Sequence, residues 1–63
     1  MLVDIADVEA VMELWDSIKD PFPKPSAREV ICIAIEKNII KKPGSRDEKK
    51  ALIREVEWCI STS

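Results

Sequence analysis

The sequence predicts an all-α protein of three short helices, at about residues 4–19, 26–41 and 46–61. Three observations support this fold class. Apolar residues recur at spacings of three and four, the period of an amphipathic helix. Two proline-containing breaks, DPFPKP at 20–25 and KKPGS at 41–45, separate the periodic stretches. A serine followed three residues later by a glutamate, the capping-box spacing, stands before the second and third stretches. Residues 1–63 are expected to form a single domain.

The first helix is predicted from DIADVEAVMELWDSIK, residues 4–19. Asp4 is placed to cap it. Lys19 lies in its last turn, where a cation interacts favourably with the negative end of the helix dipole. The apolar face is wide enough to touch two neighbours. Its members are Ile5, Val8, Val11, Met12, Trp15 and Ile18. Three alternating prolines at 20–25 remove amide donors, so this segment is expected to be an extended spacer.

The second helix contains EVICIAI, residues 29–35, a run rich in β-branched residues that also suits a buried strand. Ser26 and Glu29 have the capping-box spacing, which favours a helix. The apolar pattern continues to Ile40, which is too long for a typical strand. We therefore expect a helix over 26–41 that ends at Pro43 and Gly44. Its apolar residues spread around most of the helix, so burial on several sides is expected.

The third helix follows Ser45 and Glu48, which repeat the capping-box spacing. A narrower apolar stripe runs through RDEKKALIREVEWCI and predicts an antiparallel hairpin with the second helix. The stripe consists of Leu52, Ile53, Val56, Cys59 and Ile60. Trp58 lies off this stripe, beside Ala51 and near Arg54, where it can either cover the core edge or meet a partner.

A chain of this size buries only about 60% of the surface that its unfolded form exposes, so association with a second copy is expected. Two covering helices rarely enclose a third on every side, and a homodimeric bundle would cover the remainder of the second helix. The predicted dimer or partner interface consists of Val11, Met12, Trp15, Ile31, Ile35, Ile39 and Trp58.

The chemistry-bearing residues predict neither an enzyme nor a cofactor or metal site. The chain has no histidine and one glycine, so a histidine general base and a glycine-rich phosphate loop are both missing. Cys32 and Cys59 are expected to be reduced core residues, and two cysteines without histidine make a poor zinc set. The first ten residues have no basic region, and no apolar run could span a membrane. A cytoplasmic protein is expected.

Charge is distributed unevenly along the chain. Residues 1–20 carry six acids and one lysine, a net charge of −5, whereas residues 37–54 carry seven cations and two acids, a net charge of +5. A basic turn formed by Lys41, Lys42, Arg46, Lys49 and Lys50 could meet nucleic-acid phosphates or an acidic protein surface. The overall charge of −2 favours protein contact.

Residues 44–60, GSRDEKKALIREVEWCI, resemble the second helix of ribbon-helix-helix repressors. That resemblance implies a dimer that reads DNA through an N-terminal strand. The matching position here holds PFPKP, which departs from the family because its prolines cannot donate a ladder of amides. More broadly, the small size, acidity, helical pattern and lack of catalytic groups are similar to small accessory proteins of temperate bacteriophages. This likeness implies a regulator that acts by contact, in the host cytoplasm if it is phage-encoded.

The function expected from the sequence is therefore that of a small regulatory or adaptor protein that binds another protein, as a homodimer. Two alternatives remain open. One is a dimeric DNA-binding regulator that uses the basic turn, and the other is a structural assembly subunit.

Overall fold

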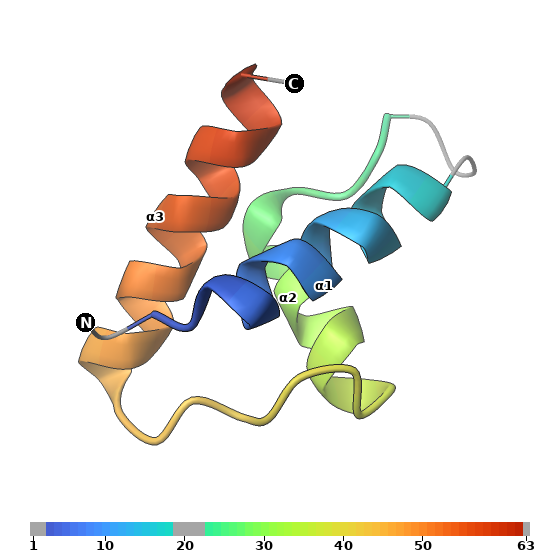
Figure 1. The fold of residues 1–63 in the computed structure, drawn as a ribbon. Helices are drawn as coiled ribbons and strands as arrows, with labels where there is room; N and C mark the ends of the chain where they lie inside the picture. The colour runs from blue at the N-terminus through green and yellow to red at the C-terminus, as the bar shows by residue number, and fades with distance from the viewer. Residues whose placement is uncertain (1–2, 19–22, 63) are drawn as a thin grey trace.

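Three α-helices enclose one small core in a computed structural model of the chain, which describes residues 3–18 and 23–62. They are α1 (Ile5–Ser17), α2 (Ala27–Glu36) and α3 (Arg46–Thr62), and no strand occurs in these ranges. Each helix contacts the other two. In Figure 1, α1 crosses in front of the pair formed by α2 and α3, which run in opposite directions. The predicted all-α class is confirmed.

Local capping starts each helix where the sequence predicts. The Asp4 side chain accepts the amide of Ala6 at 2.9 Å and caps α1. The Ser26 hydroxyl accepts the amide of Glu29 at 3.4 Å, and the EVICIAI run is helical. Such side-chain acceptors satisfy amides that have no partner within the first turn.

The predicted end of the second helix is wrong, because α2 stops at Glu36 instead of residue 41. Asn38 adopts a left-handed backbone with φ of 60°. Its amide donates to the carbonyl of Ile35 at 3.1 Å, and the amide of Ile39 donates to that of Ala34 at 2.9 Å. This pair of hydrogen bonds is a Schellman motif, which closes a helix once one residue turns left-handed. Asn38, not Gly44, therefore terminates α2.

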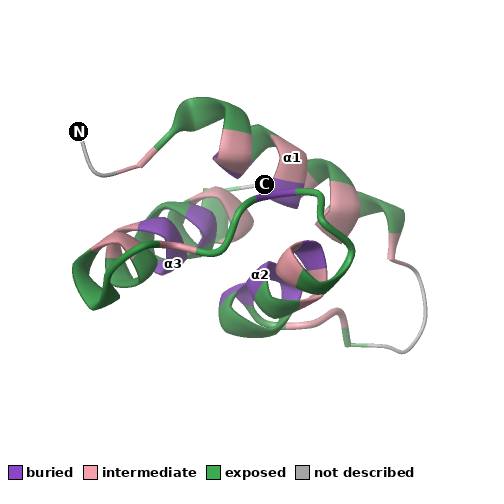
Figure 2. Cartoon of the chain, turned by 90° about the horizontal axis from the view of Figure 1, so that it is seen from below, coloured by how far each residue is buried: buried purple, intermediate pink, exposed green. Residues whose placement is uncertain are grey.

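The early stop lets the segment after α2 fold back over the core. Ile40 is buried in that segment, whereas Ile39 stays exposed. The predicted need for a second chain to cover α2 is reduced, because α1, α3 and this returning segment bury most of its apolar face. Figure 2 shows the buried positions on the faces that the helices turn toward one another. The core consists of Val8, Val11, Ala27, Val30, Ile31, Ala34, Ile40, Leu52, Ile53 and Val56.

The other predicted boundaries lie close to the observed ones. α1 ends at Ser17, with Ile18 in extended conformation, and Lys19 lies outside the described residues. α3 runs through Thr62. The predicted proline spacer at 20–25 is described only from Pro23 onward, and Pro23–Pro25 is not helical. No helix in the described ranges is long and apolar enough to cross a membrane.

Candidate protein-contact face on helix α3

Two of the residues predicted to form an interface are core residues of the chain itself. Val11 and Ile31 have no exposed surface, so in this fold neither can contact a partner. Both lie where α1 and α2 approach each other and α3, and the sequence pattern alone could not separate this intrachain packing from packing against another chain. Met12 and Ile35 are half-buried at the edge of the same core.

Trp15, another residue of the predicted interface, makes two contacts within the chain. Its indole N–H donates to the carbonyl oxygen of Pro25 at 2.9 Å. The ammonium of Lys24 lies 4.2 Å from the centroid of the same ring, a cation–π contact. Trp15 therefore holds the segment before α2 against α1, and its ring is half-buried.

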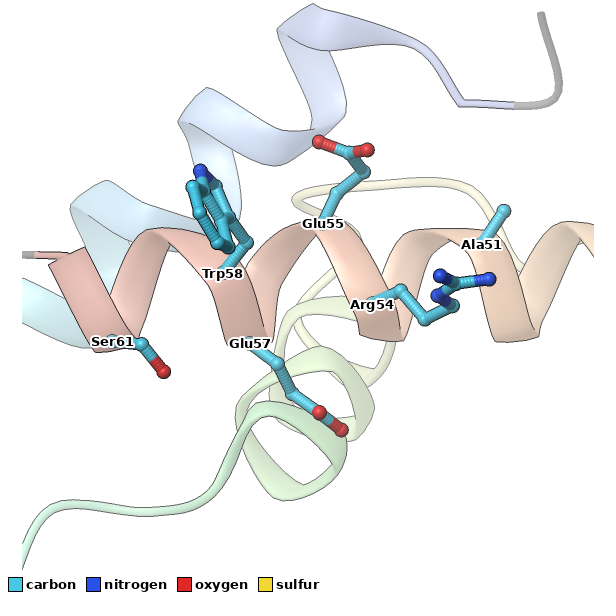
Figure 3. Close-up of a pocket in the computed structure, with 6 residues that line it drawn as sticks. All are labelled: Ala51, Arg54, Glu55, Glu57, Trp58 and Ser61. Carbon is cyan, nitrogen blue, oxygen red and sulfur yellow. The ribbon is translucent and has the colours of Figure 1, made fainter.

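Trp58, unlike Trp15, is largely exposed to solvent. Its side chain is 69% exposed, more than any other large apolar residue in the described ranges, and it lies on the side of α3 that faces away from the core. Figure 3 looks onto this side, and neither α1 nor α2 crosses in front of it. Within the part of the chain that the structure describes, the indole N–H of Trp58 has no hydrogen-bond partner. An exposed tryptophan without such a contact is unusual, whereas tryptophan is enriched where proteins bind one another.

The surface around Trp58 is a shallow depression of about 620 Å³. We call it the outer face of α3. Its lining residues are Ala51, Arg54, Glu55, Glu57, Trp58 and Ser61. Ala51, Glu55 and Trp58 project from one side of the helix, whereas Glu57 points to the other side (Figure 3). The small Ala51 side chain leaves the space that the larger neighbours surround.

A second depression, of about 580 Å³, adjoins the outer face where the start of α1 meets α3. It shares Ala51 and Glu55 with the outer face and adds apolar side chains from α1, including Ile5. Ile5 is 63% exposed although the sequence places it on the apolar face of α1. Ile5 and Glu55 were not predicted as surface candidates, because only the packing of α1 against α3 brings them together.

The five cations of the predicted basic turn are all exposed. Three of them, Lys42, Arg46 and Lys49, line a depression of about 570 Å³ between α2 and the start of α3. Cys32, Ile35 and Glu36 of α2 line it as well. The amides at the start of α3 already have acceptors: Glu48 N–H donates to the Ser45 hydroxyl at 3.2 Å, and Gly44 N–H donates to the Glu48 carboxylate at 3.0 Å. A phosphate at this helix end would compete with the chain's own side chains.

The predicted core position is wrong for Cys32, which is exposed. Cys59 is half-buried and packs against the core. Both are free thiols. The described residues contain no group of three or more cysteine, aspartate or glutamate side chains arranged to hold a metal ion.

Comparison of the chain with protein families, with curated proteins and with solved structures finds no match.

Proposed function

We propose that the chain is a non-enzymatic regulatory or adaptor protein that binds another protein through the outer face of α3. The observation that carries this proposal is the exposure of Trp58 on a helix side that no other described element covers. Interface cores are rich in tryptophan and arginine, and hot spots of this kind supply most of the binding free energy. The outer face offers both residue types, Trp58 and Arg54, beside the space over Ala51.

The contrast between the two tryptophans supports this choice of face. Trp15 makes a hydrogen bond and a cation–π contact inside the chain, so its presence is explained by the fold. Trp58 makes neither contact within the described residues, and its removal should cost the fold little. A side chain that contributes little to folding while exposing a large apolar ring fits a role in recognition.

Affinity capture from the native cytosol, followed by mass spectrometry, tests the proposal with three immobilised forms of the chain. They are the wild type, Trp58→Ala and the control Ile39→Ala. Ile39 is also an exposed large apolar residue, but it lies after α2 and outside the outer face. We expect the wild type and Ile39→Ala to retain a protein that Trp58→Ala loses. If all three variants retain the same proteins, binding does not depend on this face and the proposal fails.

A second candidate, a DNA-binding regulator, is favoured by one observation: three exposed cations gather around a single depression. If all five basic residues contact phosphates, affinity for random duplex DNA should fall by about 10²–10³-fold between 50 and 200 mM salt. An electrophoretic mobility shift at low salt checks this, with Lys42→Ala/Lys49→Ala as the variant that should bind more weakly. The absence of any shift would remove this candidate and leave the outer face of α3 unaffected.

A further inference from the structure

We propose that the partner on the outer face of α3 is a second copy of this chain, bound antiparallel about a two-fold axis. The inference rests on the proposed function, because it assigns a partner to the same face. It differs from the dimer predicted from the sequence, in which Ile31, Ile35, Ile39 and part of the first helix supplied the contact. Ile31, which was central to that prediction, is completely buried within the chain.

The four residues that carry the inference occupy one stripe of α3. Ala51, Arg54, Glu55 and Trp58 are spaced by three, four and seven residues, so on an α-helix they span an arc of about 100°. All four line the same depression. The core side of α3, formed by Leu52, Ile53 and Val56, faces the other way. Read from the N-terminal end, the stripe contains a small residue, a cation, an anion and a large aromatic ring.

Two copies of this stripe are complementary to each other when they pack antiparallel. In an antiparallel pair, the register that sets Trp58 over Ala51 of the second copy also sets Arg54 opposite Glu55 of that copy. Two-fold symmetry repeats both contacts, so each ring finds a small residue and each charge finds its opposite. A small residue beneath the ring lets the two helix axes approach to about 8–10 Å, the usual separation of packed helices. Parallel packing would set like charges against each other.

The start of α1 borders this contact and would enlarge it. Ile5 is exposed beside Ala51 and Glu55, so a helix lying along the outer face would also meet this side chain. The paired helices are 17 residues long, which corresponds to about 25 Å. An interface built on one helix pair is at the small end of specific interfaces, so association in the micromolar range is expected.

Sedimentation equilibrium tests the dimer, over total concentrations from about 10 to 500 µM. The wild type should rise from the monomer mass of 7.2 kDa toward twice that value. Trp58→Ala should stay monomeric, and Ile39→Ala should behave as the wild type. Circular dichroism checks that each variant keeps its helical content, which the exposure of both side chains favours.

Charge exchange tests the antiparallel register. Arg54→Glu alone or Glu55→Arg alone places like charges across the axis and should weaken association by about tenfold or more. The double variant Arg54→Glu/Glu55→Arg restores opposite charges and should dimerise like the wild type. An equimolar mixture of the two single variants should form a heterodimer, because one copy then carries two acids and the other carries two cations at the axis.

Three results would overturn the inference: a wild type that sediments as a monomer throughout the range, a double variant that associates no better than the single variants, or masses beyond the dimer. The last result would indicate an open assembly. None of them decides the proposed function, which requires only that a protein partner binds the outer face through Trp58. A monomeric chain that still loses a captured protein on Trp58→Ala would keep that function and exclude only the second copy as the partner.

Discussion

Ile31→Ala, compared with Ile39→Ala, is the most decisive test of the fold. Both residues were predicted to lie at an interface, but only Ile31 is a core residue. Ile31 is completely buried in α2, whereas Ile39, which lies in the segment after α2, is 41% exposed. Removing a buried isoleucine side chain costs about 2–5 kcal/mol, because apolar burial is lost and a cavity remains. A 63-residue domain has a total stability of about 3–9 kcal/mol. The substitution should therefore remove about a fifth of the stability or more.

We expect Ile31→Ala to lower the free energy of unfolding by about 3 kcal/mol, which corresponds to a fall in Tm of about 12–24 °C in a domain of this size. Ile39→Ala should change the free energy of unfolding by less than about 1 kcal/mol, because much of the side chain is already in water. Thermal and urea unfolding followed by far-UV circular dichroism measures both variants. If Ile31→Ala unfolds too far to be measured, Ile31→Val should still cost about 0.5–1.5 kcal/mol.

The reasoning would be refuted by a Tm for Ile31→Ala close to that of the wild type, or by an equal fall in Ile39→Ala. Either result would mean that α2 does not pack as described. Measurement at several protein concentrations excludes a contribution from association, since a core effect does not depend on concentration.

Three further substitutions test local contacts, each by urea unfolding against the wild type. Trp15→Phe removes the hydrogen bond to the Pro25 carbonyl and should cost about 1 kcal/mol; an unchanged midpoint would show that this bond does not fasten the segment before α2. Asn38→Ala places a Cβ-bearing residue without a local acceptor in the left-handed region and should cost about 1 kcal/mol, whereas Asn38→Gly should not; equal losses would contradict the proposed helix stop. Ser45→Ala removes the acceptor for the Glu48 amide and should cost about 1 kcal/mol, and no loss would mean that water replaces this cap.

The candidate site was only partly predictable from the sequence. Trp58 was identified because it lies off the apolar stripe of α3, and that property can be read from a helical wheel. Ile5 was missed because it belongs to the apolar face of α1, and only the angle at which α1 meets α3 leaves it exposed. Glu55 was missed because a carboxylate on a wet helix side has no distinguishing local signal. It acquires a proposed role only beside Trp58 and Ala51 in one depression.

The start of each helix and the fold class follow from local residue patterns. Capping by Asp4, Ser26 and Ser45 depends on residues no more than three positions away, so the spacing of residue types is enough to predict it. Asn38 also acts locally, and an asparagine at that position was a readable stop signal. Which apolar residues form the core and which stay on the surface depends on how the helices pack together. Burial depends on how distant elements meet, and no pattern within one helix records whether the neighbour covering it belongs to the same chain or to another.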